Sequence, residues 1–129
     1  MKILGIDYGQ KKIGLAIAEG KLAEPYKVIR YKLPDEAIEK VVKVVIVEEV
    51  DKVVVGISEG KMGNESKSFS LSLRDRLIIP VVTFDETLTT QEAQKLAIEA
   101  GISRKKRRDL EDAFSAALIL QAYLDFKGK

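Results

Sequence analysis

Residues 3–18 read ILGIDYGQKKIGLAIA and carry the strongest fold signal in the chain. An apolar segment, a short polar turn around Gly9 and a second apolar segment beginning near Ile13 form the pattern of a β-hairpin. We expect Gly9 to supply a positive φ angle at the bend. Asp7 is the exception, because it is a carboxylate at the end of an otherwise apolar strand. It either anchors the turn or faces a positively charged group.

Composition narrows the chemistry that the chain can perform. The 129 residues are 46% hydrophobic and 33% charged, which is typical of one globular domain, here residues 1–129. The absence of cysteine and histidine excludes disulfides, thiolate or imidazole zinc sites and catalytic triads built on these residues. Any catalysis would therefore rely on carboxylates, hydroxyls, Lys or Arg, together with a hard metal ion. Without a bilayer-spanning apolar run or a recognisable signal peptide, we expect a cytoplasmic protein with no membrane partner.

The order of the expected elements indicates an α/β fold. Residues 24–31 form a third strand after the hairpin, so the chain opens with an antiparallel meander of three strands. Apolar residues recur at helical spacing over 34–47, which predicts a helix despite its many β-branched residues. The apolar run at 51–57 predicts a strand buried in a parallel sheet. A loop at 58–63, a helix at 64–77, a strand at 79–84, a helix at 89–100 and a final helix from residue 109 follow.

Right-handed crossovers predict the orientation of the two later strands. Both should run parallel to the first strand, which gives a five-stranded mixed sheet with helices on both faces. In such a sheet, ligands bind beyond the carboxyl ends of the parallel strands. The first strand ends there at Asp7, and the last ends at Asp85 and Glu86. We favour Glu86 for the site, because alternation from Phe84 places it opposite Asp85, although pattern alone leaves both residues open.

A third carboxylate lies on the final helix. Asp112 falls in its first turn, in line with Ala116 and Ile119 on a face too apolar for solvent. Asp112 could simply favour the positive end of the helix dipole, and Glu86 could be a solvated loop residue. Three acids at one edge of a sheet would repel one another unless a cation lies between them, and oxygen-only ligands favour Mg²⁺ or Mn²⁺. The sequence therefore predicts a metal site formed by Asp7, Glu86 and Asp112.

A run of five cations precedes the final helix. Its members are Arg104, Lys105, Lys106, Arg107 and Arg108. The net charge of the whole chain is only +2, so the overall charge balance does not argue for a nucleic-acid partner. Basic loops are usually solvated surface, but Lys and Arg contacts to phosphates supply most non-specific affinity for nucleic acids. A basic run beside an acidic metal site suits a polyanion whose phosphate is cleaved.

Several blocks of sequence, taken together and in order, resemble one family. They are GIDYG at 5–9 with Lys11, IGLA at 13–16, VVGI at 54–57, DE at 85–86, LTT at 88–90, EA at 92–93, DA at 112–113 and AALIL at 116–120. They resemble the YqgF (RuvX-like) family, which belongs to the ribonuclease H-like superfamily. Its members are described as candidate Holliday junction resolvases and as candidate nucleases that mature the 5′ end of pre-16S ribosomal RNA.

The resemblance implies a ribonuclease H-like fold and a metal-dependent endonuclease. By the same resemblance, Asp7, Glu86 and Asp112 would hold two Mg²⁺ or Mn²⁺ ions and carry catalysis. The substrate would be a structured RNA, with pre-16S rRNA favoured, or a four-way DNA junction, whose two-fold cleavage would require a homodimer. Lys11 and the basic run would contact the nucleic acid. Thr87 stands where the family has Arg, so one of these cations would have to hold the substrate phosphate near Glu86.

Two other interpretations stay open. The chain could be a nucleic-acid-binding module without catalysis, such as a ribosome-assembly factor, in which the acids are vestigial. Asp-x-Gly at 7–9 followed by Lys-x-x-Gly-x-Ala at 11–16 also resembles the first phosphate loop of sugar kinases and actin-like ATPases. Those folds place two such domains around a nucleotide, and 129 residues supply only one.

Overall fold

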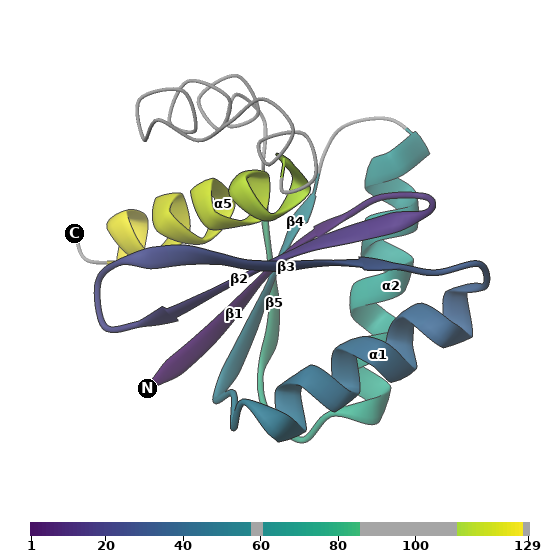
Figure 1. The fold of residues 1–129 in the computed structure, drawn as a ribbon, viewed down its shortest axis with the longest axis horizontal. Helices are drawn as coiled ribbons and strands as arrows, with labels where there is room; N and C mark the ends of the chain where they lie inside the picture. Colours follow the sequence, from purple (N-terminus) through teal and green to yellow (C-terminus); the bar gives the residue numbers. More distant parts are fainter. Residues whose placement is uncertain (58–60, 86–110, 128–129) are drawn as a thin grey trace.

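The computed structural model describes residues 1–57, 61–85 and 111–127 of the chain (Figure 1). Its elements are β1 (Lys2–Tyr8), β2 (Lys12–Glu19), β3 (Ala23–Arg30), α1 (Pro34–Val47), β4 (Lys52–Ile57), α2 (Lys61–Arg76), β5 (Val81–Asp85) and α5 (Glu111–Lys127). The strands form one mixed sheet in the order β3-β2-β1-β4-β5. The pairs β1–β2 and β2–β3 are antiparallel, whereas β1–β4 and β4–β5 are parallel. The predicted meander with two parallel crossover strands is therefore confirmed.

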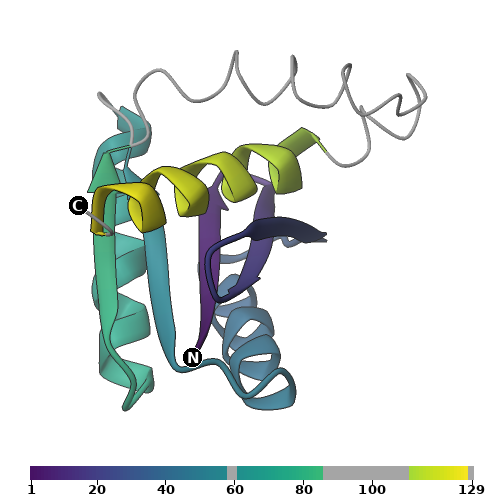
Figure 2. The same cartoon turned by 90° about the vertical axis from the view of Figure 1, so that its left-hand side faces the viewer.

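The two faces of the sheet carry side chains of different size. On one face, large apolar residues such as Leu4, Ile13 and Val55 pack beneath α1 and α2 and form the larger part of the core. On the other face, small residues such as Ala16 and Ala18 pack beneath α5. Figure 1 shows helices on both sides of the sheet, and Figure 2 shows α5 crossing the strands on its own side. The predicted placement of helices on both faces is confirmed.

Helix α1 forms although its second half is rich in β-branched residues. Pro34 lies in the first turn, where its missing N–H costs nothing, and Asp35 and Glu36 lie near the positive end of the helix dipole. The buried side chains of this helix are Ala37, Ile38, Val41, Val44 and Val45. Because this three- and four-residue spacing matches the helical period, burial against the sheet outweighs the β propensity of the valines.

Helix α2 begins at Lys61, earlier than the predicted Asn64, so the loop that we expected to extend to residue 63 ends sooner. Phe69 and Leu73 lie four residues apart and are both buried, whereas Leu71 between them is exposed. Residues four apart share a helix face, while a strand would bury alternate positions together. The alternating sequence in this region is therefore compatible with a helix.

Helix α5 is the deeply buried final helix that the sequence predicted. Its buried residues are Ala113, Phe114, Ser115, Ala116, Ala117, Ile119, Leu120 and Tyr123. Only towards its carboxyl end does a large apolar side chain, Phe126, become exposed. In the described part of the chain, no helix combines the length and apolar character needed to cross a membrane.

The role of Gly9 in the hairpin differs from the predicted one. Within the described residues, positive φ angles occur at Gly20 and Glu49, and Gly9 is not among them. The Gly9 N–H donates to the carbonyl oxygen of Lys12 at 3.0 Å, and a Cβ atom on Gly9 would lie 2.7 Å from that oxygen. Glycine is needed here because the backbone closes tightly. The expectation of a positive φ angle was wrong.

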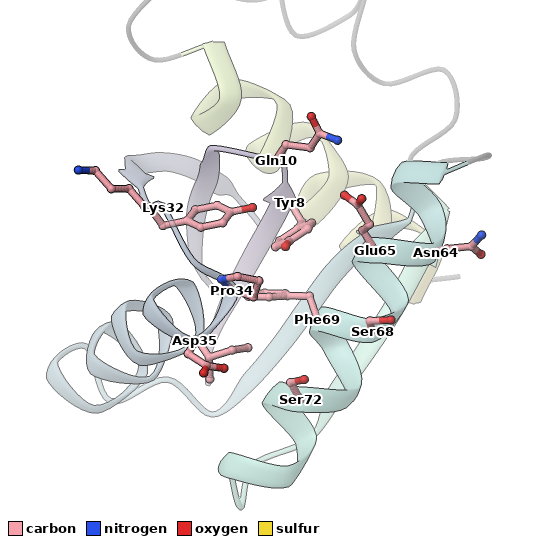
Figure 3. A pocket seen from close by; sticks show the side chains of 12 residues that line it. Tyr8, Gln10, Lys32, Pro34, Asp35, Asn64, Glu65, Ser68, Phe69 and Ser72 are labelled. Carbon is pink, nitrogen blue, oxygen red and sulfur yellow. The ribbon is translucent and has the colours of Figure 1, made fainter.

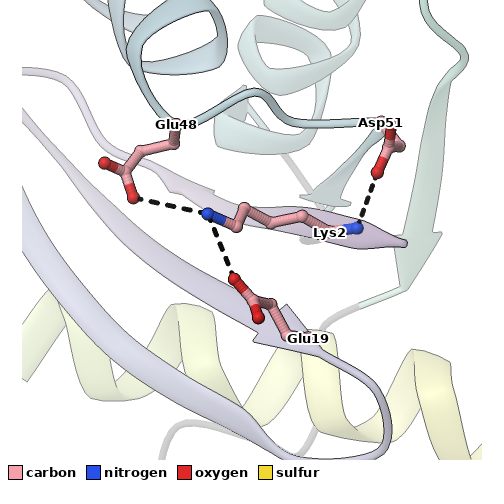
Figure 4. A network of polar contacts seen from close by, with 4 residues as sticks. All are labelled: Lys2, Glu19, Glu48 and Asp51. Carbon is pink, nitrogen blue, oxygen red and sulfur yellow. Dashed lines mark hydrogen bonds and ion pairs between the residues drawn. The ribbon is translucent and has the colours of Figure 1, made fainter.

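A network of charged groups surrounds the amino end of β1 (Figure 4). The Lys2 ammonium lies 3.1 Å from a carboxylate oxygen of Glu19 and 3.8 Å from one of Glu48. The hydrogen bond to Glu19, together with the charge of Glu48, raises the pKa of Lys2 above its ordinary value. The backbone N–H of Lys2 donates to Asp51 at 2.8 Å. Complementary charges thus hold this end together, and the predicted site lies at the opposite end of β1.

The core assignment of α1 is tested by one chemical change at two positions. Val41 is fully buried and Val47 is 64% exposed. Val41→Ala should lower the free energy of unfolding by about 1–3 kcal/mol, because it removes buried methyl groups and leaves a cavity. Val47→Ala should change it by less than about 0.5 kcal/mol. Urea unfolding of both variants measures the difference, and equal losses would contradict the helical register.

Candidate active site

Asp7 lies near the carboxyl end of β1, on the face of the sheet that α5 covers. Side chains alternate along the strand: Ile6 packs beneath α1 and α2, whereas Gly5 lies against α5, so Asp7 shares the α5 side. Its ladder partners are Gly14 on β2 and Gly56 on β4. Neither partner places a side chain next to the half-buried carboxylate.

Asp112 lies over the same part of the sheet, in the first turn of α5. A Cβ atom on Gly14 would lie 1.8 Å from the carbonyl oxygen of Asp112, so the helix backbone touches β2 at this glycine. Gly14 is also the ladder partner of Asp7, and partners in an antiparallel ladder have Cα atoms about 5 Å apart. The structure therefore brings together the segments of Asp7 and Asp112, which lie near opposite ends of the sequence.

Lys12, which the sequence analysis did not identify, belongs to this cluster, whereas the predicted contact of Lys11 with nucleic acid stays a prediction. The Lys12 ammonium lies 3.1 Å from Oδ2 of Asp112, and the two side chains are 43% and 29% exposed. Lys11 is an exposed residue of the hairpin turn. Because Ile13 packs beneath α1 and α2, its neighbours Lys12 and Gly14 lie on the α5 side. This period-two alternation is the signal that could have identified Lys12.

The other predicted site residues lie outside the described residues. They are Glu86 and the basic run Arg104, Lys105, Lys106, Arg107 and Arg108. The strand that leads to Glu86 is described. Phe84 contacts Tyr123 of α5 with 5.8 Å between the ring centroids, so the next residue, Asp85, alternates to the opposite face. Asp85 therefore does not share the face on which Asp7 lies, and the role of Glu86 stays a prediction.

Asp7 and Asp112 offer oxygen ligands of the kind that hard divalent cations bind. Among the described residues, no three His, Cys, Asp or Glu side chains are grouped closely enough to hold a metal ion. Two carboxylates nevertheless share the α5 side, and the ion pair with Lys12 shows that Asp112 already binds a cationic group. Carboxylate oxygens are preferred by Mg²⁺ and Mn²⁺. The donor set fits such an ion, with Glu86 as the predicted third ligand.

A pocket of about 560 Å³ lies on the other face of the sheet, behind the end of β1 (Figure 3). The ring centroid of Tyr8 lies 4.5 Å from that of Phe69 and 6.0 Å from that of Tyr31. The Tyr31 hydroxyl donates to the carbonyl oxygen of Gly9, which ties the hairpin turn to the segment after β3. Burial of the phenol, with the neighbouring Tyr8 hydroxyl, raises the pKa of Tyr31 well above its ordinary value.

Tyr31→Phe tests this support of the turn. At neutral pH the variant should lose about 1 kcal/mol of unfolding free energy, because one hydrogen bond to Gly9 is removed. A pKa that is higher in the folded state means that folding favours the protonated phenol. That contribution is therefore fully present below the unfolded value of about 10 and declines at higher pH. Urea unfolding should show the difference between wild type and variant shrinking above about pH 10; a difference that stays constant would contradict the assignment.

Gly14→Ala tests the contact that positions Asp112. The added methyl group would overlap a backbone oxygen that cannot rotate away, so we expect a loss near the upper end of the usual overpacking cost of about 1–3 kcal/mol. Gly5→Ala is the matched control, since its Cβ atom would lie 2.8 Å from Cβ of Leu120, further along α5. Both variants should be destabilised in urea, but only Gly14→Ala should shift the NMR amide resonance of Asp112. Wild-type stability of Gly14→Ala would refute the contact.

A family model described as "RuvX: Holliday junction resolvase" matches residues 1–126 of the chain. A relative from Pelotomaculum thermopropionicum is 41% identical over 138 residues, which cover 100% of this chain and 90% of the relative. One from Halothermothrix orenii is 37% identical over 137 residues, which cover 100% of this chain and 98% of the relative. Both relatives carry the name "Putative pre-16S rRNA nuclease".

Among solved structures, the chain is similar to RuvC of T. thermophilus in complex with a Holliday junction substrate. The TM-score is 0.68 at 19% sequence identity, and the match covers 98% of this chain and 96% of the RuvC chain. Such a likeness concerns the fold. It confirms the ribonuclease H-like fold that the family resemblance implied.

Proposed function

Because the chain belongs to the RuvX family of Holliday junction resolvases, we propose that residues 1–129 form one nuclease domain that cuts structured nucleic acid with the help of divalent metal ions. The observation that carries the proposal is the contact between α5 and Gly14, which places Asp112 beside the ladder partner of Asp7. The names of both relatives favour pre-16S rRNA as the substrate. Maturation of its 5′ end in the cytoplasm would be the cellular role.

Asp7, Asp112 and Glu86 would hold two Mg²⁺ or Mn²⁺ ions. When bound, such a pair of ions activates the attacking water and stabilises the leaving oxygen. Asp7 suits this task because β1 is paired on both sides, with β2 and β4, which fixes its backbone. Asp112 is held in place by the contact of its carbonyl oxygen with Gly14. The chain thus presents two carboxylates from two rigid elements on one side of the sheet.

The ammonium group of Lys12 adds a positive charge to the site besides the metal ions. This ammonium partly offsets the repulsion between Asp112 and the carboxylate of Asp7, and the effect is modest because both members of the ion pair keep partial exposure. The lysine stem is flexible and its head is a compact charge, so Lys12 can also turn to a substrate phosphate oxygen. Together with Lys11 and the basic run, it would replace the Arg that the family carries at Thr87.

A four-way DNA junction is the second candidate substrate. The description of the family model favours it, and so does the fold shared with a RuvC structure that contains such a junction. A junction has two-fold symmetry, so symmetric cleavage needs two active sites related by the same symmetry. We therefore expect a homodimer if the junction is the substrate, and cleavage by a monomer if the RNA is.

Asp7→Asn and Asp112→Asn test the active site. Each substitution removes a charged ligand, and loss of even an outer-shell partner costs about 10–100-fold at metal sites, so cleavage should fall by at least about 100-fold. The assay compares a pre-16S RNA carrying its 5′ leader with a labelled four-way DNA junction, with Mg²⁺ or Mn²⁺. The wild type should cut the RNA in preference.

Asp125→Asn is the matched control for these variants. Asp125 is an exposed residue of the same helix as Asp112, and it accepts a hydrogen bond from Gln121 at 3.1 Å. This variant should cleave at the wild-type rate, and circular dichroism should show all variants folded. Wild-type cleavage by Asp7→Asn would remove Asp7 from the mechanism. A folded wild type that cuts neither substrate would refute the nuclease function.

A further inference from the structure

Four exposed cations border a groove between β3 and α1. Its volume is about 470 Å³. The cations are Lys27 and Arg30 on β3 and Lys40 and Lys43 on α1. Among the described residues, no acidic side chain lines this β3–α1 groove. The concentration of positive charge contrasts with the nearly balanced charge of the whole chain.

We propose that the β3–α1 groove binds backbone phosphates of the nucleic-acid strand that continues from the cleaved position. The identity of this strand rests on the proposed function, whereas the binding of a polyanion follows from the groove itself. Each phosphate contact made by Lys or Arg releases counterions from the nucleic acid.

The groove and the candidate active site lie on opposite sides of the edge strand β3. Arg30 follows the buried Ile29, which packs beneath α1, so the Arg30 side chain lies on the α5 side. Arg30 is the ladder partner of Lys12, and Lys12 forms the ion pair with Asp112. Lys27 is paired with Leu15, whose side chain packs beneath α1 and α2, so Lys27 lies on the α1 side. Strand β3 lies at the edge of the sheet and continues into the segment that begins α1 (Figure 1). A strand held at Asp112 would therefore meet Arg30 on the α5 side and, once it crosses the edge of the sheet at β3, the lysines of the groove.

Contacts within the groove hold its shape without cancelling its charge. The Lys40 ammonium donates to the carbonyl oxygen of Arg30 at 2.8 Å, which ties α1 to β3. The Lys27 ammonium lies 5.4 Å from the ring centroid of Tyr26. In the part of the chain that the structure describes, no ion pair involves any of the four cations. Their charge is available to a ligand.

Protection of an edge strand against pairing does not by itself explain the groove. Lysine on an edge strand discourages pairing with a strand of another molecule, and Lys27 alone would serve that purpose. Such a role gives no reason for Lys43 to line the same groove from a helix, where only Lys40 has a structural task in its hydrogen bond to β3. The ring of Tyr26, which is 37% exposed, adds a surface on which an unpaired base can stack. Phosphate binding accounts for both elements.

The double variant Lys27→Gln/Lys43→Gln tests the proposal, and it leaves Lys40 in place because that residue ties α1 to β3. The matched control Lys21→Gln/Lys67→Gln removes the same charge from exposed residues of the β2–β3 turn and of α2. Fluorescence anisotropy would measure the affinity for labelled oligouridylate RNA and for a labelled four-way DNA junction over a range of KCl concentrations. EDTA in the buffer prevents cleavage.

The groove variant should bind more weakly than the control, with a shallower salt dependence. The slope of log K against log salt should fall by about 1.4 on the RNA and about 1.8 on the junction, since each lost contact lowers it by about 0.7 on single strands and about 0.9 on duplex DNA. The control should change it by less than half as much. A loss confined to one of the two nucleic acids would support the groove and identify the strand that it holds.

Equal slopes for the groove variant and the control on both nucleic acids would overturn the proposal, and so would a wild type that binds neither. Because binding is measured without metal, its outcome is separate from cleavage. A groove-dependent slope in a protein that cuts neither substrate would keep the groove and refute the nuclease. Cleavage of either substrate without a groove-dependent slope would keep the nuclease function and refute the groove.

Discussion

The close approach of α5 to the sheet underlies both the core and the candidate active site. A Cβ atom would lie 1.8 Å from the carbonyl oxygen of Asp112 if Gly14 had one, and 2.8 Å from Cβ of Leu120 if Gly5 had one. Protein interiors are close-packed, so a larger side chain at either position would hold the helix away. Two glycines on one sheet face thus let a single helix fill the core through Leu120 and present a carboxylate through Asp112.

The sheet divides its tasks between its faces and between its ends. Large side chains beneath α1 and α2 build most of the core. The opposite face contributes less to the core and carries small residues beneath α5. At the amino end of β1, Lys2 is surrounded by carboxylates that neutralise it. At the carboxyl end, Lys12 and Asp112 form an ion pair in which both side chains keep partial exposure. The first arrangement stabilises the fold, and the second remains accessible to a ligand.

Predictions from the sequence succeeded where local pattern carries the information. The antiparallel meander, the parallel orientation of β4 and β5 and the helical state of α1 followed from hydrophobic period and chain connectivity. They failed where backbone approach matters. Gly9 was expected at a positive φ angle, whereas glycine is needed there because the Lys12 carbonyl oxygen leaves no room for a Cβ atom. Helix α2 was expected to begin at Asn64 and begins earlier, at Lys61. A turn or helix start depends on a few backbone hydrogen bonds, which residue type specifies weakly.

The residues alone placed the chain in the α/β class, with Asp7 at the carboxyl end of the first strand. The lack of cysteine and histidine left oxygen atoms as the expected ligands of a metal ion. These conclusions needed no structure, because composition and periodicity are properties of the sequence itself. Three other features were decided only by the tertiary structure. They are the contact of α5 with Gly14, the ion pair between Lys12 and Asp112, and the groove that Lys27 and Lys43 share. Each of these joins elements that are distant in the chain, and the distances between such elements are set by how side chains of different size pack together.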